Sequence, residues 1–399
     1  MKLNKTHLRL SILFQSIIFV PILISQSIGS DWDSYAIIGT VQNLYLNNTY
    51  LPSRPPGFPL YEGFVYLAYF ASKAVGINFE ISILMLQFLL TIILSYIVYL
   101  FFKKEDKRNS YFYFVIIFSP IYLISGFTVI DYFLGSIFGF LSIYVQLHKN
   151  DLAKYTPLFL SIAVAIRLTN IFFVFVVLIL QYRSKEENKI IIKNFLYFIL
   201  FSLIIQLPFY LNLWQSTLSE SLNSIIDATC ILSLTNTDHS LIDRMGRFIL
   251  KQTEFFGIIG SLGIFISIFY FKKENFSKNF HLLILFILFE LSFLRLPTEE
   301  GHLLPAFISL ILLLSSLRLP RYLIGLILFS TIFSNIVNLS IYSVDQVDGA
   351  EEIYFGLNFE DGVFINDLRS RNKIALEKDF HYENGLLQNT NIWSNGCPN

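Results

Sequence analysis

The chain has 399 residues, of which 54% are hydrophobic and only 15% are charged. A soluble domain usually carries about 25% charged residues, so this composition excludes a soluble protein that covers a core with polar surface. The formal net charge of zero argues against nucleic acid as the main partner. Apolar runs recur from one end of the chain to the other. The composition therefore predicts an all-α polytopic membrane protein.

About eleven apolar segments approach the length of a membrane-spanning helix, which needs about 20 residues, or fewer where neighbouring helices bury its ends. In chain order they are residues 10–28, 81–102, 111–127, 132–147, 155–166, 171–182, 195–213, 257–271, 281–294, 303–317 and 322–339. The first segment follows three basic residues and is nearer to transmembrane length than to that of a cleaved signal peptide, so we interpret it as an uncleaved span. We expect about eleven spans, within a range of roughly ten to thirteen.

The orientation follows from the basic connections. These are residues 103–108, 148–154, 183–193, 272–278 and 318–321. Segment 63–75 is apolar but short and contains Lys73. If it does not span, all five connections lie in the cytoplasm with the N-terminus, as the positive-inside rule requires. We therefore predict an interfacial or re-entrant helix within a first outer loop, residues 29–80. Residues 1–340 would form the transmembrane domain, and residues 341–399 a small polar tail outside.

Two carboxylates, Asp31 and Asp33, directly follow the first predicted span. In an extended segment, residues two apart point the same way. The pair could bind a divalent cation such as Mg²⁺ or Mn²⁺, or one member could act as a general base. Arg54 precedes two prolines that stiffen the backbone, and a guanidinium there suits a phosphate group. The spacing alone equally allows solvated loop charges and an interfacial anchor.

These residues form two sequence elements, Asp-Trp-Asp-Ser-Tyr-Ala at 31–36 and Ser-Arg-Pro-Pro-Gly-Phe-Pro-Leu-Tyr-Glu at 53–62. Together they resemble the GT-C superfamily, which includes protein mannosyltransferases, aminoarabinose transferases of lipid A and oligosaccharyltransferases. The resemblance implies a multi-helix membrane fold and a sugar taken from a polyprenyl or dolichyl phosphate carrier. It implies a catalytic acid four residues before Tyr35 (Asp31) or two before it (Asp33), acting as a base or through a metal. It also implies that Tyr35 contacts substrate and that Arg54 meets the carrier phosphate.

Three later features agree with that resemblance. Asp131 lies at the predicted outer end of a span, where the family often has a second functional acid. Arg167 interrupts an apolar hairpin at the predicted outer face, where an ionisable residue is costly unless it is paired or interfacial. Residues 295–305, which begin with Arg295, resemble the family's basic-x-x-x-Tyr-Leu-Leu-Pro signature, with His302 in place of the tyrosine. For Asp131 and Arg167, ordinary snorkelling at helix ends remains an alternative.

The resemblance implies an inverting glycosyltransferase that uses a polyprenyl-phosphate-linked sugar and a glycan, lipid or protein acceptor. Arg54, with Arg295 or a metal ion, would stabilise the leaving phosphate. The alternatives are a lipid or small-molecule transporter or flippase, and an O-antigen-type polymerase or acyltransferase. Ionisable residues gather at one face rather than at the midplane, where transport sites usually lie. Glu290 is the exception and needs a polar partner, for which Arg295 and Arg167 are candidates. The membrane could be a bacterial plasma membrane or an endoplasmic reticulum; the modest length and the lack of a large predicted soluble domain favour the bacterial plasma membrane, with the site outside.

Overall fold

The computed structural model describes residues 4–30, 32–48, 50, 53, 58–104, 110–148, 151–216, 241–295, 300–347 and 350–376. Its α-helices are α1 (Lys5–Ser25), α2 (Trp32–Asn47), α3 (Pro59–Val75), α4 (Phe79–Lys104), α5 (Phe112–Ile117), α6 (Pro120–Phe127), α7 (Tyr132–His148), α8 (Thr156–Ile166), α9 (Ile171–Arg183), α10 (Asn188–Ser216), α12 (Leu241–Ile268), α13 (Lys273–Lys278), α14 (Phe280–Arg295), α15 (Leu304–Leu314), α16 (Arg321–Phe333) and α17 (Val363–Ala375). Short 3-10 helices are η1 (Asp151–Tyr155), η2 (Leu168–Asn170) and η3 (Glu300–Leu303), and the strands are β1 (Val337–Val347) and β2 (Ala350–Asp361).

Long apolar helices dominate the described residues. Three are long and apolar enough to cross a membrane: Lys5–Ser25, Phe79–Lys103 and Asn188–Leu207. Helices α6 and α7 meet the same test together, although they are bent by 113° at their junction. Shorter apolar helices cover Leu168–Arg183, Phe280–Leu294, Gly301–Leu314 and Arg321–Phe333. The prediction of a predominantly helical chain with membrane-compatible helices is therefore confirmed.

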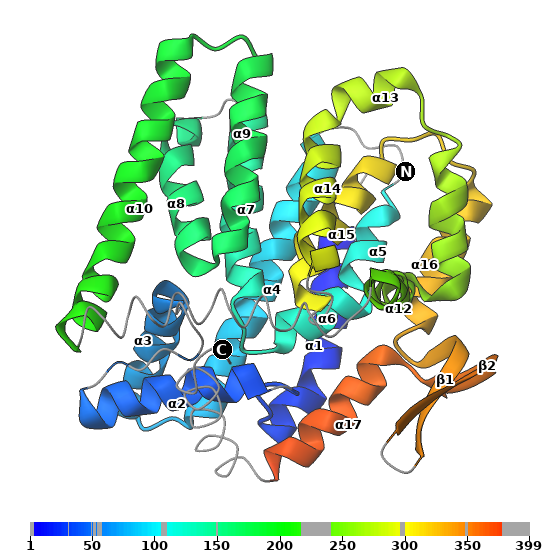
Figure 1. The fold of residues 1–399 in the computed structure, drawn as a ribbon, viewed down its shortest axis with the longest axis horizontal. Coiled ribbons are helices and arrows are strands. Elements are labelled where there is room, and N and C mark those ends of the chain that lie inside the picture. The colour runs from blue at the N-terminus through cyan, green and yellow to red at the C-terminus, as the bar shows by residue number, and fades with distance from the viewer. Residues whose placement is uncertain are drawn as a thin grey trace.

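The polar connections between several helices lie together at the end of the bundle that also holds the N-terminus (Figure 1). Three side-chain hydrogen bonds join these connections, from Gln146 to Glu186 (2.8 Å), from Arg183 to Ser277 (3.3 Å) and from Asn279 to Ser316 (3.0 Å). They link the end of α7, the α9–α10 turn, α13 and the α15–α16 connection. This grouping agrees with the expectation that these basic connections share one side.

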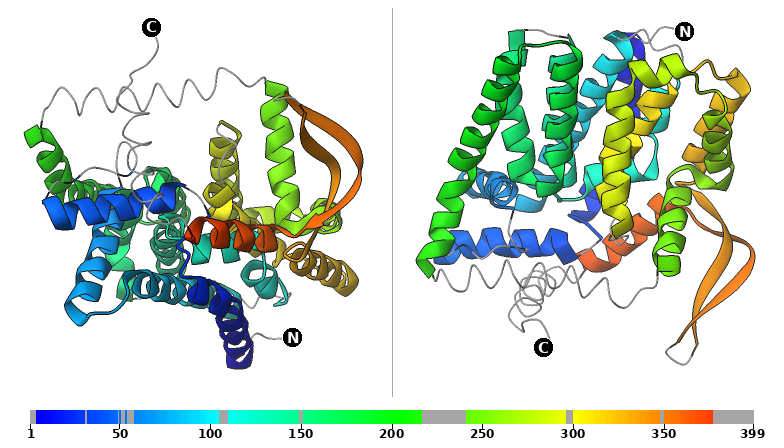
Figure 2. Two further views of the ribbon diagram at one scale, coloured as in Figure 1. Left: turned by 90° about the horizontal axis from the view of Figure 1, so that it is seen from below. Right: turned by 45° about the horizontal axis from the view of Figure 1, so that its top comes forward.

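Helix α3 does not run the length of the bundle. Phe58, just before α3, lies 5.7 Å from the Arg167 guanidinium at the end of α8, as measured to the Phe58 ring centroid. Asn78, just after α3, donates to Gln26 at the end of α1 (3.2 Å). Both ends of α3 therefore lie on the side away from the N-terminus, beside α2, which crosses that end of the bundle (Figures 1 and 2). This placement agrees with a helix at 63–75 that does not span.

Two predicted spans differ in their helical boundaries. Segment 111–127 is divided into α5 and α6, because Pro120 cannot continue the hydrogen bonding of a preceding helix; Ser119 caps the new helix by accepting from the Tyr122 backbone N–H. Segment 257–271 is the second part of α12, which begins at Leu241 and bends at Gly257, where φ is 65°. A positive φ favours glycine, so the predicted start at Gly257 marks a kink inside the helix.

The last predicted span, 322–339, is wrong in its final part. Helix α16 ends at Phe333, and β1 begins at Val337 and pairs antiparallel with β2, with Val337 opposite Asp361. The alternation of apolar and polar residues from Val337 has the period of two that indicates a strand. The predicted boundary at residue 340 therefore falls inside a hairpin, and the predicted polar tail contains the end of β1 together with β2 and α17. This hairpin also departs from an all-α fold within the described residues.

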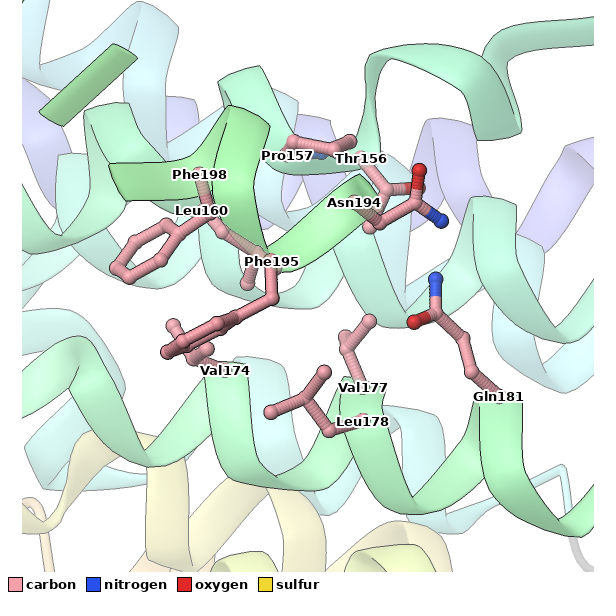
Figure 3. A pocket seen from close by; sticks show the side chains of 10 residues that line it. All are labelled: Thr156, Pro157, Leu160, Val174, Val177, Leu178, Gln181, Asn194, Phe195 and Phe198. Atoms are coloured by element: carbon pink, nitrogen blue, oxygen red, sulfur yellow. The ribbon is translucent and has the colours of Figure 1, made fainter. Parts of the chain in front are cut away.

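A small cavity lies between α8, α9 and α10 (Figure 3). Thr156, Gln181 and Asn194 are polar residues in a lining that is otherwise mostly apolar. Its volume of about 10 Å³ is about the space that one water molecule needs. The cavity is therefore a packing gap within this helical group rather than a ligand site.

Candidate functional site

Three ionisable side chains from distant parts of the chain meet on the side away from the N-terminus. Arg167 Nη1 donates to Asp131 Oδ1 at 2.7 Å, and Arg167 Nη2 lies 2.7 Å from Nε2 and 3.0 Å from Nδ1 of His302. We call this group the Asp131–Arg167–His302 cluster. Its members were each predicted as site residues from separate sequence features, and the structure brings them together.

Local backbone geometry presents each member of the cluster. Asp131 stands directly before α7, and its carbonyl accepts from the Gly135 N–H at 3.2 Å, so it begins that helix. Arg167 ends α8 in an extended conformation (φ −152°, ψ 124°). His302 lies in η3, directly before α15. Three helix ends are thus joined by two side-chain contacts of one arginine.

Burial makes the pairing within the cluster obligatory. Asp131 is 0% exposed and Arg167 is 7% exposed, and a buried charge is tolerated only when it is paired and hydrogen-bonded. A guanidinium can only donate hydrogen bonds. Both ring nitrogens of His302 lie within hydrogen-bond distance of Arg167 Nη2, and the tautomer of the ring decides which of them accepts.

Aromatic rings cover the guanidinium of Arg167. The Tyr132 ring centroid lies 4.2 Å from Arg167 Cζ, and the Phe58 centroid lies 5.7 Å away. Such cation–π contacts stabilise a desolvated arginine. A Cβ at Gly301 would lie 2.3 Å from the Tyr132 ring, so only glycine lets η3 approach closely enough to place His302 beside Arg167.

The first outer loop is described in part. Asp33 lies in the first turn of α2, where a carboxylate is favourable, and is partly buried. Because α2 begins at Trp32, the extended backbone expected to aim Asp31 and Asp33 the same way does not continue through Asp33. Tyr35 is 1% exposed and its hydroxyl lies 3.5 Å from the Gly29 carbonyl oxygen, so it packs in the core rather than on an open surface.

The structure does not describe the side chains of three other predicted site residues. Asp31 and Arg54 lie outside the described residues, and Arg295 ends α14 with its side chain outside them. Within the described part of the chain, no group of three or more His, Cys, Asp or Glu side chains could hold a metal ion. A divalent cation at Asp31 and Asp33 therefore stays a prediction.

Glu62 joins Tyr50 and Ser53 of the first loop to the start of α3, and it was not among the predicted site residues. It is buried at the start of α3, and its Oε1 accepts from the Ser53 N–H (2.9 Å) and the Ser53 hydroxyl (2.5 Å). Its Oε2 accepts from the Tyr50 hydroxyl. The only signal in the sequence was an acidic residue in the first turn of a helix that begins with proline.

Helix α17 holds a second buried ion pair that was also missed. Arg371 Nε donates to Asp367 Oδ2 at 2.5 Å, and Arg371 Nη1 donates to the Phe127 carbonyl at the end of α6 at 2.8 Å. Asp367 Oδ1 accepts from the Ser30 hydroxyl at 2.6 Å. The predicted tail is therefore attached to the end of α6 and to the residue before Asp31. The i,i+4 spacing of the pair on a helix was the signal available in the sequence.

Glu290 has a different partner from those expected. Gln252 Nε2 of α12 donates to Glu290 Oε2 at 2.7 Å, whereas Arg167 is engaged by Asp131 and His302. The apolar run at 257–271 predicts only the second part of α12, so Gln252 stands outside the predicted span.

No protein-family model, curated protein or solved structure matches this chain.

Proposed function

We propose that this protein is a multi-pass membrane glycosyltransferase. It moves a sugar from a polyprenyl- or dolichyl-phosphate carrier to a glycan, lipid or protein acceptor on the non-cytoplasmic face. The observation that carries the proposal is the convergence of Asp131, Arg167 and His302, which were singled out by resemblance to one family, into one cluster. The same face holds α2 and the start of the first outer loop (Figure 1).

The proposed topology has about eleven spans, with the N-terminus in the cytoplasm of a bacterium and the site outside its plasma membrane. The shared location of the basic connections supports this orientation, because Lys and Arg concentrate in cytoplasmic loops. Helix α3, whose two ends lie on the same side, keeps the number of spans compatible with it. A cysteine at Ser184, in the α9–α10 turn, should then react only with reagents that enter the cytoplasm.

In the proposed reaction, Asp31 or Asp33 accepts the proton of an acceptor hydroxyl, and the oxygen attacks the anomeric carbon of the donor. The bond from that carbon to the phosphate oxygen breaks, and its electron pair leaves with the lipid phosphate, so the configuration inverts. A phosphate leaving group needs cationic and hydrogen-bonding stabilisation rather than a proton. Arg54 and Arg295 are proposed to supply the charge.

His302 is proposed to donate a hydrogen bond to the carrier phosphate. It is half-buried, while Arg167 and Asp131 are buried behind it. In the proposed complex a ring N–H of His302 donates to a phosphate oxygen, as an imidazole can donate from one nitrogen and accept at the other. Arg167, held by Asp131, is proposed as a positioning residue that orients His302.

The test uses purified protein with a short-chain polyprenyl-phosphate sugar. The double variant Asp31→Asn with Asp33→Asn should lose at least about 100-fold in transfer, the size typical of losing a general base. Asp151→Asn, which removes an exposed carboxylate in the connection before α8, should leave transfer unchanged. Full activity in the double variant would refute the assigned base. Counterflow uptake without turnover by the wild type would favour a transporter instead.

The role of His302 is tested by a matched pair of variants. His302→Tyr keeps a hydrogen-bond donor and has the residue type of the family signature, whereas His302→Phe differs from it only by the hydroxyl. Loss of a hydrogen bond to a charged group costs about 1.5–3 kcal/mol. We therefore expect His302→Phe to raise the donor KM by roughly ten- to hundredfold, with His302→Tyr close to wild type. Equal KM values in the two variants would contradict the phosphate contact.

A further inference from the structure

A cavity of about 370 Å³ opens between the end of α6, α12, α17 and the hairpin. These elements lie side by side on the side of the molecule away from the N-terminus (Figures 1 and 2). Pockets for small ligands usually measure about 300–1,000 Å³, so the cavity has the size of such a site. One stripe of α17 lines it, formed by Val363, Asn366, Asp367 and Ser370. Their i, i+3, i+4, i+7 spacing means that a whole helix face is turned toward the cavity.

The cavity lining includes a sequence neighbour of each part of the proposed catalytic centre. Ser30, which lines it, directly precedes Asp31 in the chain, and Gly301, in η3, directly precedes His302. A molecule bound here therefore lies beside both the first outer loop and the Asp131–Arg167–His302 cluster. Arg167 and His302 are not themselves part of the lining.

Carboxylates outnumber cations in the cavity lining, where Lys251 is accompanied by Glu254, Glu360, Asp361 and Asp367. Lys251 pairs with Glu254 at 3.5 Å. Asp361 pairs with Arg369, and Asp367 pairs with Arg371 at 2.5 Å. The lining therefore has little surplus positive charge with which to bind a phosphate.

The remaining polar groups suit hydroxyl-bearing ligands. Asn338, Asn366, Ser125 and Ser370 line the cavity with amides and hydroxyls, which can both donate and accept hydrogen bonds. Ile121, Ile124 and Phe255 supply an apolar part of the wall. A sugar ring, with hydroxyls at its edge and C–H groups on its faces, matches such a mixed lining.

We infer that this cavity binds the acceptor, and that the acceptor carries a neutral, hydroxyl-rich sugar. The inference rests on the proposed function and adds the class of acceptor and its place. The anionic donor would bind on the other side of η3, near His302. An acceptor hydroxyl in the cavity would then lie next to the loop that holds Asp31 and Asp33.

The test measures binding directly and does not depend on catalysis. In a background with Cys230→Ser and Cys397→Ser, a single cysteine is introduced either as Ser370→Cys, which lines the cavity, or as Asn372→Cys. Both positions are exposed on α17, but Asn372 is not among the lining residues. The rate of maleimide labelling is measured with mannotriose or chitotriose as neutral probes, and with a short-chain polyprenyl phosphate as an anionic probe.

We expect at least one neutral trisaccharide at millimolar concentration to slow labelling of Ser370→Cys several-fold without changing that of Asn372→Cys. Adding Ser125→Leu, which fills the cavity from α6, should remove the protection. Equal rates with and without both trisaccharides would overturn the inference, as would protection by the polyprenyl phosphate alone. If a trisaccharide protects Ser370→Cys from labelling but the protein transfers no sugar, the cavity is still a glycan-binding site, and only the proposed glycosyltransferase activity is refuted.

Discussion

The ion pair between Asp131 and Arg167 offers a quantitative test of the cluster. The interacting atoms are 2.7 Å apart, which at an effective dielectric constant of about 20 corresponds to a gross attraction of about 6 kcal/mol. Desolvation offsets part of this, but breaking a buried pair from one side costs about 3–5 kcal/mol, because the remaining charge stays buried. We therefore expect Asp131→Asn and Arg167→Gln each to destabilise the protein by about that amount.

The two single variants should differ in how much stability they lose. Without Arg167, the Asp131 carboxylate loses its ion pair while it stays buried, since it is 0% exposed. Without the Asp131 charge, the guanidinium still lies 4.2 Å from the Tyr132 ring centroid, and this contact compensates for part of the loss. Arg167→Gln should therefore be the more destabilising change. The double variant should cost less than the sum of the two, with an interaction energy of about 1–3 kcal/mol.

The assay is unfolding in mixed micelles at increasing SDS fraction, followed by circular dichroism. Lys251→Gln is the matched control, because its pair with Glu254 is longer (3.5 Å) and about 30% exposed and should contribute no more than about 1 kcal/mol. Single variants as stable as the wild type would refute the reasoning. Strict additivity in the double variant would also refute it, because it would mean that the two side chains do not interact.

Two further predictions concern packing on the same side of the molecule. Arg371→Met should destabilise the attachment of α17 by about 3–5 kcal/mol, the cost of removing one member of a buried pair, and should speed proteolysis within residues 337–376. Arg369→Met, which changes an exposed side chain, should cost no more than about 1 kcal/mol. Equal rates of proteolysis in the two variants would contradict the role of Arg371 in holding α17 to the end of α6. Gly301→Ala should lower thermal stability in detergent by about 1–3 kcal/mol, because its Cβ would lie 2.3 Å from the Tyr132 ring. Gly325→Ala in α16, whose Cβ would meet nothing within 4 Å, should instead be neutral or stabilising by up to about 1 kcal/mol, and a Gly301→Ala variant as stable as Gly325→Ala would refute the close approach.

Some features of the fold could be predicted from single residues and short patterns. Runs of apolar residues are local properties, so the predicted segments at 81–102, 132–147 and 281–294 correspond to α4, α7 and α14 with small shifts at their ends. The break at Pro120 and the kink at Gly257 do not follow from the apolar pattern, because they depend on how the chain turns within the bundle. The hairpin was missed because its first apolar residues also continue the preceding helical pattern.

The sequence by itself determined that the chain is helical and apolar, and which ionisable residues stand next to the ends of its helices. Only the tertiary structure decided their partners: Arg167 pairs with Asp131 and His302, Glu290 with Gln252, and Arg371 with the end of α6. The physical reason is that burial makes every charge require a partner, but which partner is near depends on the packing of helices far apart in the chain. Hydropathy is averaged over about twenty residues, whereas these contacts join residues separated by as many as 244 positions.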